Sequence, residues 1–341
     1  MKHPAEVDVA VLILFFTRPE PLKKVFGEIR KARPSKLYLY QDGPRGEQDL
    51  TGIEACRKVV CDEEIDWECD VRRNYQTENA GCDPSNFNAQ KWAFSLNDKC
   101  IIFEDDSIPS VTFIRFCKEM LDRYEHDERI VMIEGFNIDE ETPNVPDDYF
   151  FTTIMTIWGW ASWRRVIDQW DEHYTFLDDE YNMHQLRQVI KYRNYRKDIP
   201  KSCHDHRKLG KAYYESIFWA CMMFNNGLAI TPTRNMISNL GPIGESTHYA
   251  GSLDTIPRRL RKLFTMERFE LNFPLKHPRY VIENIDYKNH FYKVNAYNHP
   301  WRKIGYSLEE LVYNLRYGNY YHVWKSLKNR IVKLAGMKKY K

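Results

Sequence analysis

The stretch Cys100-Ile101-Ile102-Phe103-Glu104-Asp105-Asp106 joins a short apolar run directly to three consecutive carboxylates. An apolar run of this length is typical of a buried strand in a parallel sheet. Such a strand ends at the rim of its sheet, and open α/β folds bind ligands in the crevice beyond the carboxyl ends of their strands. The sequence therefore favours a ligand site at these acids over the alternative for a charge run, a solvated acidic turn.

Three neighbouring carboxylates at a half-buried rim repel one another and lose hydration. A divalent cation or a hydrogen-bonding ligand usually offsets that cost. The acids therefore indicate a metal ion together with a phosphate-bearing ligand. A metal-dependent phosphohydrolase or a nucleotidyltransferase would need the same cluster, so the reaction class stays open on this feature alone.

The segments on either side of this run alternate between strand and helix patterns. We expect strands at residues 9–16, 37–40, about 67–71, 130–133, 150–157 and 228–230. Apolar residues at helical spacing indicate helices at residues 22–29, 85–96 with Ser85 as the cap, 113–124 and 214–222. Strands separated by helices predict right-handed crossovers and a mainly parallel α/β sheet flanked by helices.

Composition and charge narrow the class of protein. The 341 residues are 43% hydrophobic and 14% aromatic, which argues against disorder, and a net charge of +2 does not by itself indicate a nucleic-acid partner. The eight cysteines lack the paired short spacing of a zinc site, so we expect them to be reduced. No stretch is long and apolar enough to span a membrane, and the acidic start does not resemble a signal peptide. We therefore expect a cytoplasmic protein.

The segment Trp158-Gly159-Trp160-Ala161-Ser162-Trp163-Arg164-Arg165 places three tryptophans around a glycine and beside two arginines. A sugar-binding face, an aromatic core and a partner surface could each use these rings. Residue types alone favour core packing for at least two of them.

Several stretches occur in a fixed order over roughly residues 8–250. They are Leu14-Phe15-Phe16-Thr17-Arg18-Pro19, Arg33-Pro34-Ser35, Tyr40-Gln41-Asp42-Gly43, Phe103-Glu104-Asp105-Asp106, Trp158-Gly159-Trp160 and the loop 238–248. In this order they resemble nucleotide-sugar glycosyltransferases of the GT-A fold, in particular the bacterial sugar transferases related to the N-acetylglucosaminyltransferase I family. The resemblance implies a Rossmann-like GT-A domain over residues 1–255, followed by an aromatic, basic and helical appendage over residues 256–341.

The resemblance also implies roles for the acid triplet. Asp106 matches the family's ligand for Mn²⁺ or Mg²⁺, which would bridge the two phosphates of the donor. Glu104 and Asp105 match positions at the ribose or at metal-bound waters. His248 matches a loop position near the phosphates and is a candidate metal ligand or phosphate donor, although a lone histidine is more often neither.

Four further residues match the nucleotide side of the family's site. Asp42 matches the acid at the uracil edge, and Arg18 matches a basic residue at the nucleotide, where a guanidinium can pair two phosphate oxygens. Trp158 and Gly159 fall in the matching tryptophan segment and are further candidates for binding the nucleotide sugar. For each charged residue the alternative is a loop charge in a surface pair, worth under roughly 1 kcal/mol.

Glu215, at the start of an otherwise apolar helix, matches the family's catalytic base. An inverting transfer needs a carboxylate that takes the proton from the acceptor hydroxyl. The family more often has Asp at this position, and a carboxylate that only complements the helix dipole is the competing interpretation. The resemblance thus implies transfer of a hexosyl or N-acetylhexosaminyl group from a nucleotide diphosphate sugar, UDP-linked in that family, to a saccharide or lipid-linked acceptor. A non-enzymatic saccharide-binding protein at the membrane is the other alternative.

The C-terminal tail has a different character. From Leu311 onward it carries eight lysine and arginine residues, several tyrosines and no acid, and Trp324, Leu327, Ile331 and Leu334 fall on one helical face. A basic amphipathic helix of this kind suits an anionic membrane surface, which predicts peripheral binding to the inner face of the membrane. The alternative is a helix docked on the catalytic domain. No recognition motif for nucleic acid accompanies the charge.

Overall fold

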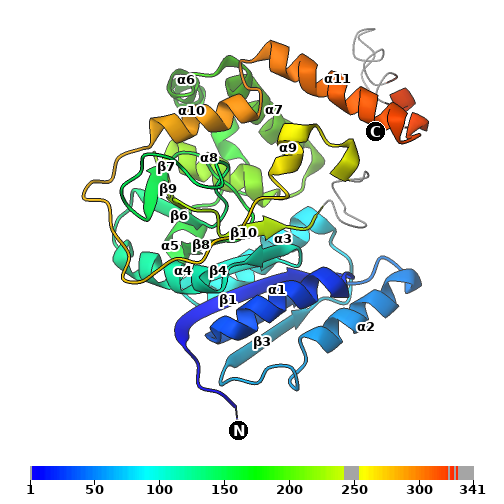
Figure 1. The fold of residues 1–341 in the computed structure, drawn as a ribbon, viewed down its shortest axis with the longest axis vertical. Helices are drawn as coiled ribbons and strands as arrows, with labels where there is room; N and C mark the ends of the chain where they lie inside the picture. Colours follow the sequence, from blue (N-terminus) through cyan, green and yellow to red (C-terminus); the bar gives the residue numbers. More distant parts are fainter. Residues whose placement is uncertain (1, 242–252, 322, 326–327, 329–341) are drawn as a thin grey trace. The chain divides into compact units, whose positions relative to one another are not determined.

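The computed structural model describes residues 2–241, 253–321, 323–325 and 328 (Figure 1). The chain divides into two compact units, which are described separately. The first comprises Met1–Leu240 and Met266–Phe291, and the second comprises Gly241–Thr265 and Tyr292–Lys341. The predicted domain boundary after residue 255 falls inside the second of these units.

A mainly parallel sheet of eight strands forms the core of the first unit. Its strands are β1 (Val7–Phe15), β2 (Pro34–Gln41), β3 (Asp70–Tyr75), β4 (Lys99–Glu104), β6 (Ile130–Glu134), β7 (Tyr149–Thr152), β8 (Trp160–Trp163) and β9 (Leu228–Pro232). Their order across the sheet is β3-β2-β1-β4-β8-β6-β9-β7. Strands β8 and β7 run antiparallel to their neighbours, and the other pairs are parallel. The predicted α/β class with a mainly parallel sheet is confirmed.

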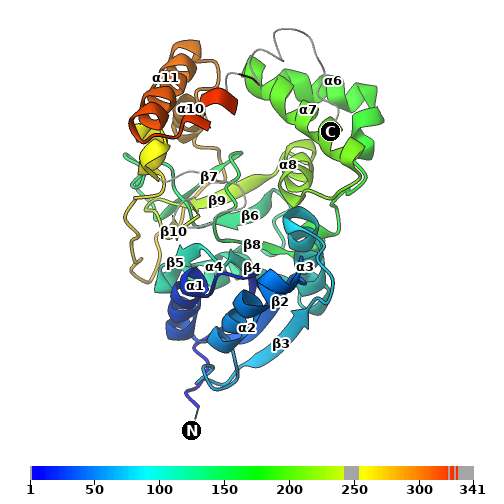
Figure 2. The same ribbon diagram turned by 90° about the vertical axis from the view of Figure 1, so that its right-hand side faces the viewer.

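Helices cover the sheet, and a short two-stranded sheet lies beside it. The helices of the first unit are α1 (Pro19–Ala32), α2 (Leu50–Val59), α3 (Cys82–Leu96), α4 (Val111–Arg123), α5 (Arg164–Ile167), α6 (Glu180–Val189), α7 (Arg193–Leu209) and α8 (Tyr214–Phe224). The small sheet pairs β5 (Ser107–Pro109) with β10 (Ile237–Asn239). Helix α1 packs against α2 and α4, whereas α3 packs against α5 and α8. Figure 2 shows α1 and α4 to one side of β4, and α3 and α8 to the other.

The expected bounds of several elements in this unit were wrong in detail, and the strand expected over residues 150–157 ends at Thr152 as β7. Strand β3 begins three residues later than the expected start at Trp67, whose ring is instead fully buried and donates its indole N–H to the carbonyl of Pro34 at 2.8 Å. Helix α3 begins at Cys82 rather than after Ser85, whose backbone N–H already bonds to the carbonyl of Gly81 at 3.0 Å. The earlier start follows from contacts of the preceding loop with Asp42, described below.

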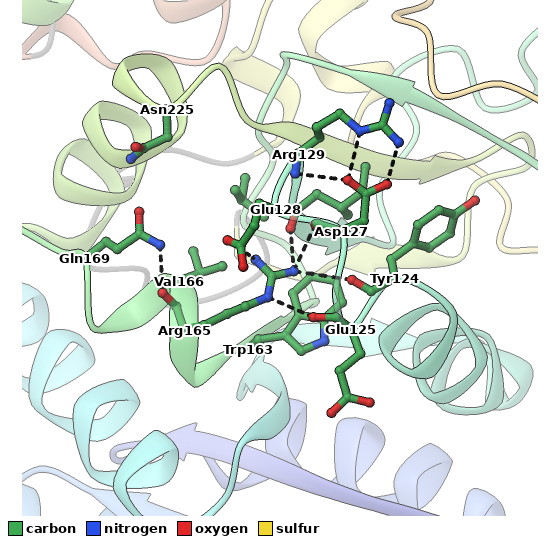
Figure 3. A network of polar contacts seen from close by, with 12 residues as sticks. Tyr124, Glu125, Asp127, Glu128, Arg129, Trp163, Arg165, Val166, Gln169 and Asn225 are labelled. Atoms are coloured by element: carbon green, nitrogen blue, oxygen red, sulfur yellow. Dashed lines mark hydrogen bonds and ion pairs between the residues drawn. The ribbon is translucent and has the colours of Figure 1, made fainter.

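The tryptophan segment is partly core, as predicted. Trp160 and Trp163 are buried, and Trp163 donates its indole N–H to the carbonyl of Leu121 at 3.0 Å. The Arg165 guanidinium lies 4.6 Å from the Trp163 ring centre and donates to four carbonyl oxygens between residues 124 and 130 (Figure 3). This arginine therefore closes the turn between α4 and β6.

All eight cysteines are free thiols. Within the described parts of the chain, no helix has both the length and the apolar character needed to cross a membrane.

The second unit contains α9 (Arg258–Lys262), the end of α10 (Ile285–Val294), α11 (Pro300–Arg316) and a 3₁₀ turn at Leu253–Thr255. His248 and three members of the predicted tail stripe, Leu327, Ile331 and Leu334, lie outside the described residues.

Candidate active site

The carboxyl ends of β1, β2 and β4 meet at one edge of the sheet. Parallel pairing aligns Phe15 with Gln41, and Leu14 with Glu104. Residues that directly follow these aligned strands must therefore lie around the same edge. Arg18 follows β1, Asp42 follows β2, and the rest of the acid triplet follows β4. The register thus brings together residues that lie as much as 88 positions apart in the sequence.

Arg18 holds the two aspartates of the triplet together. Its guanidinium forms a short ion pair with Asp105 and a second one, at 2.9 Å, between Nη2 and Oδ2 of Asp106. The other carboxylate oxygen of Asp106 accepts a hydrogen bond from Nδ2 of Asn239 at 3.2 Å, and its backbone carbonyl accepts one from the N–H of Leu240 at 2.8 Å. The strand β10 therefore fixes the acid turn from a position 133 residues later in the chain.

Burial and the charge of Arg18 shift the pKa of Asp105 in opposite directions. Burial raises the pKa of the Asp105 carboxyl above its ordinary value, and the charge of Asp106 adds to that effect, although Arg18 opposes both. For Arg18, burial alone would lower the pKa, but the two aspartates outweigh it and raise the pKa. Arg18 thus stays charged. Its positive charge offsets the repulsion between the carboxylates of Asp105 and Asp106.

Glu104, the first acid of the triplet, faces the start of α8. Its Oε1 accepts a hydrogen bond from the Tyr214 hydroxyl at 3.2 Å. Burial raises the pKa of Glu104, and the charges of Asp106 and Glu215 raise it further. Glu215, the predicted base, directly follows Tyr214, so the start of α8 that carries it lies beside Glu104. The structure brings these two predicted site residues together.

Glu215 occupies the first turn of α8, as predicted, and is half-buried. Burial raises the pKa of its carboxyl to about 7, to which the charge of Asp83 contributes. Burial also raises the pKa of the Cys82 thiol to about 12, with further contributions from Glu104 and Glu215. The first turn of α3 thus contributes Asp83, and the first turn of α8 contributes Glu215, to the same group of acids as Glu104.

Asp42 makes a full set of internal hydrogen bonds. Its carboxylate accepts from the backbone N–H groups of Gly43, Ala80 and Gly81 and from Nδ2 of Asn79, each at 3.0 Å. A carboxylate offers about four acceptor positions. Asp42 therefore fixes the loop that enters α3, which explains the early start of this helix. Its role at a uracil edge stays a prediction.

Gly159 lies against Ile237 of β10, and the neighbouring Trp158 packs on Phe136. Gly159 has a positive φ of 68°, and a Cβ atom there would lie 2.6 Å from Cδ1 of Ile237. The Trp158 ring is half-buried and meets Phe136 edge to face, with 4.6 Å between the ring centres. Only glycine fits this turn without displacing Ile237. The predicted contact of this pair with a nucleotide sugar stays a prediction.

The donor set at the triplet suits a hard divalent cation. Asp105 and Asp106 present carboxylate oxygens, the ligands that Mg²⁺ and Mn²⁺ prefer, and their charge is offset here by Arg18. Within the described residues, no group of three or more His, Cys, Asp or Glu side chains is arranged to hold a metal ion on its own. Mg²⁺ commonly binds one or two carboxylates and takes its remaining ligands from substrate phosphates and water. Asp105 and Asp106 fit that mode.

Sequence reasoning missed two polar residues at this edge, Tyr214 and Asn239. Tyr214 directly precedes the predicted base, so its position at the helix start was readable, but its bond to Glu104 was not. Asn239 lies in the loop that the family resemblance covers, yet no spacing rule indicates that it reaches Asp106. Both contacts are tertiary and follow from the sheet topology.

Comparison with known proteins gave matches to solved structures alone. No protein-family model matches the sequence, and no curated protein sequence matches it significantly. A UDP-glucose pyrophosphorylase solved with UDP-glucose is 9% identical over 48% of this chain and 78% of its own, with a TM-score of 0.29. Mouse xyloside xylosyltransferase 1, in its apo form, is 13% identical over 39% of this chain and 54% of its own, with a TM-score of 0.28.

A putative glucose-1-phosphate thymidylyltransferase from Bacillus anthracis, solved with sucrose, is also similar. It is 9% identical over 47% of this chain and 73% of its own, with a TM-score of 0.28. Such TM-scores are too low to support an argument about fold or function. The α/β assignment of this chain therefore rests on the strand order and pairing of its own sheet.

Proposed function

We propose that this protein is a glycosyltransferase that moves a sugar from a nucleotide diphosphate donor, UDP-linked, to a hydroxyl of a saccharide or lipid-linked acceptor. One observation carries the proposal. The acid triplet with its arginine lies beside the first turn of α8, because the Tyr214 hydroxyl donates to Glu104 at 3.2 Å and Glu215 directly follows Tyr214. A site for a charged leaving group and a candidate base therefore share one location.

The donor side of the site is formed by Arg18, Asp105 and Asp106. Arg18 carries a permanent charge and can pair two phosphate oxygens. Asp106, with Asp105 beside it, would hold Mn²⁺ or Mg²⁺. When bound, such an ion offsets the negative charge that develops on a diphosphate leaving group. Glu104 lies on the side facing α8, where its hydrogen bond to Tyr214 fixes its orientation.

The acceptor side of the site is formed by Glu215 at the start of α8. A general base works best when its pKa lies near the operating pH, because it is then ionised yet still holds a proton well. Burial gives Glu215 such a pKa, about 7. In the proposed reaction its carboxylate takes the proton from the acceptor hydroxyl as that oxygen attacks the sugar carbon. The attack comes from the side opposite the leaving group, so the configuration is inverted.

Aromatic side chains beside Glu215 support a saccharide acceptor. The rings of Tyr213 and His206 stack with 3.8 Å between their centres and 15° between their planes. Nδ1 of His206 lies 2.9 Å from the hydroxyl oxygen of Ser216, which directly follows the base. Asp83 adds a second carboxylate, since its charge acts on Tyr213, His206 and Glu215 alike. Carboxylates and aromatic faces together suit a ligand rich in hydroxyl groups and apolar ring faces.

The test is a transfer assay with a panel of UDP-sugars, candidate saccharide acceptors and Mn²⁺. Glu215→Gln should lower the transfer rate by about a hundredfold or more while donor affinity changes little, the range typical of general acid–base catalysis. Glu180→Gln is the matched control, because Glu180 also lies in the first turn of a helix, α6, and has no role in the proposal. This control should retain full activity.

The pH profile and the product stereochemistry give independent readouts. A base must be ionised to act, so the wild-type rate should fall as the pH drops through about 7, well above the ordinary range of a glutamate. NMR of the product should show inverted configuration. Retained configuration would exclude Glu215 as the base. Release of nucleotide at the same rate without any acceptor would instead favour the phosphohydrolase or nucleotidyltransferase alternative.

A further inference from the structure

Helix α11 of the second unit carries its large apolar side chains on an exposed face. These side chains, between 38% and 83% exposed, are Trp301, Ile304, Leu308, Leu311, Val312 and Leu315. At 100° per residue they fall within an arc of about 100° along the helix. We call this set the apolar stripe. A stripe of this width is what an amphipathic helix normally buries.

The opposite side of α11 attaches the helix to its own unit. The Tyr306 hydroxyl donates to the carbonyl of Val294 at 2.9 Å, and the Arg261 guanidinium lies 5.2 Å from the centre of the Tyr313 ring. Glu309 accepts a hydrogen bond from the backbone N–H of Arg258 at 3.1 Å. On the helix, Tyr306, Glu309 and Tyr313 lie on the side away from the apolar stripe. The helix is thus held by its polar side and presents its apolar side outward.

A contiguous exposed apolar face of this kind marks an interaction surface. The charged residues of α11 and of the sequence that follows it indicate which class of partner would bind. Helix α11 contains Arg302, Lys303 and Arg316 against Glu309 and Glu310, and the sequence after Arg316 adds seven lysine and arginine residues and no acid. Two copies of such a segment would repel each other, whereas an anionic surface would attract it.

The aromatic residues near the end of α11 favour a lipid surface among anionic partners. Tyr317, Tyr320, Tyr321 and Trp324 are each at least half exposed. Tyrosine and tryptophan are enriched at the boundary between lipid headgroups and acyl chains, because their rings are apolar and their tips are polar. A nucleic acid would be attracted by the charge but offers no acyl layer for the apolar stripe.

We propose that α11 is a membrane-binding helix that lies in the headgroup region of an anionic bilayer, with the apolar stripe toward the acyl chains. The stripe predicted from the sequence begins at Trp324, so the apolar stripe of α11 is a second exposed apolar face within the appendage that was predicted to be helical. The inference does not depend on the proposed sugar transfer. It does explain how an enzyme of this kind would reach an acceptor held in a membrane.

The test measures binding of the full-length protein to vesicles by co-sedimentation. Vesicles that mix phosphatidylglycerol with phosphatidylcholine should bind the protein, and pure phosphatidylcholine vesicles should bind it less. Raising the ionic strength should weaken the binding, because salt screens attraction between exposed charges. Failure of the wild-type protein to bind the mixed vesicles would overturn the proposal.

Two double variants distinguish an effect of the apolar stripe on vesicle binding from an effect of exposed apolar residues in general. Leu308→Ser with Leu315→Ser changes residues that are 57% and 45% exposed, and Leu96→Ser with Val189→Ser changes residues of the first unit that are 45% and 55% exposed. The stripe variant should bind mixed vesicles at least about tenfold more weakly. The control variant should bind within about twofold of the wild type.

Light scattering on the same proteins tests the alternative partner, a second copy of the chain. The proposal expects a monomer whose mass the stripe variant does not change. A dimer that the stripe variant converts to a monomer, without vesicle binding by either protein, would assign the apolar stripe to self-association. Equal loss of vesicle binding in the stripe and control variants would also contradict the proposal.

Discussion

Replacement of Arg18 by methionine should destabilise the first unit through the acid pair that Arg18 neutralises. Methionine keeps an unbranched apolar stem but removes the guanidinium that pairs with Asp105 and Asp106. Arg18 precedes α1 and makes no side-chain cap hydrogen bond, so the substitution does not remove a helix cap. The expected loss is therefore electrostatic.

The size of the loss follows from the burial of the three side chains. Removing one partner of a fully buried ion pair costs about 3–5 kcal/mol. The aspartates are nearly buried, with side chains 6% and 10% exposed, but Arg18 is 27% exposed, so water screens part of the interaction. We expect a loss of about 2–3 kcal/mol in the free energy of unfolding, which for a chain of this size lowers Tm by about 3–5 °C.

The loss should depend on pH with a defined sign. Burial already raises the pKa of Asp105, and Arg18 opposes that rise, so removing Arg18 raises the pKa further. A carboxyl group whose pKa is raised in the folded state costs stability as the pH rises through that pKa. The gap in Tm between variant and wild type should therefore be larger at pH 8 than at pH 5. Thermal unfolding followed by circular dichroism measures both values.

A matched control is Arg72→Met, which breaks an exposed pair with Asp70 whose side chains are 60% and 48% exposed. Such pairs contribute under about 1 kcal/mol, so this control should change Tm little. If Arg18→Met and Arg72→Met gave the same shift, or if the Arg18 effect were equal at both pH values, the electrostatic reasoning would be wrong.

Two further predictions concern buried carboxylates other than the proposed base Glu215. Asp42→Ala should cost about 1–3 kcal/mol of unfolding free energy, measured with urea, because it leaves backbone donors of the loop before α3 without an acceptor. Burial raises the pKa of Glu134 to about 7, so wild-type stability should fall by about 3 kcal/mol as the pH rises from 4.5 past 7. Glu134→Gln should flatten that fall, since an amide does not titrate, and an unchanged slope would contradict the assignment.

The parts of the fold that the sequence predicted are those that local pattern determines. Strands β1 and β4 contain the continuous apolar runs 9–15 and 100–103, which are typical of strands buried on both faces of a sheet, and the stripe of α4 has a clear helical period. The polar segment from residue 178 to 211 gave no such signal and yet forms α6 and α7. Its one readable cue was Asp179, whose carboxylate caps α6 by accepting from the N–H of Asn182 at 2.9 Å.

The parts of the site that the sequence predicted are those that follow strand ends. The acid triplet was expected at a strand end from its apolar run, and the resemblance added Arg18 and Asp42; the register shows that the strands before all of them end at one edge of the sheet. Which group each of them contacts depends on elements far away in the chain. Asp42 turned out to bind the loop before α3, and Asp106 binds Asn239 of β10. Neither partner follows from residue spacing, because tertiary packing selects them.

Isothermal titration calorimetry with UDP is the most direct test of a cation-dependent nucleotide site at Asp106. In Mn²⁺ the wild-type protein should bind UDP, and a chelator should weaken binding by about tenfold or more, since each tenfold change corresponds to about 1.4 kcal/mol. Asp106→Asn, shown by circular dichroism to be folded, should bind weakly with or without Mn²⁺. Wild-type affinity that the chelator leaves unchanged, or an Asp106→Asn variant that binds like the wild type, would contradict the account.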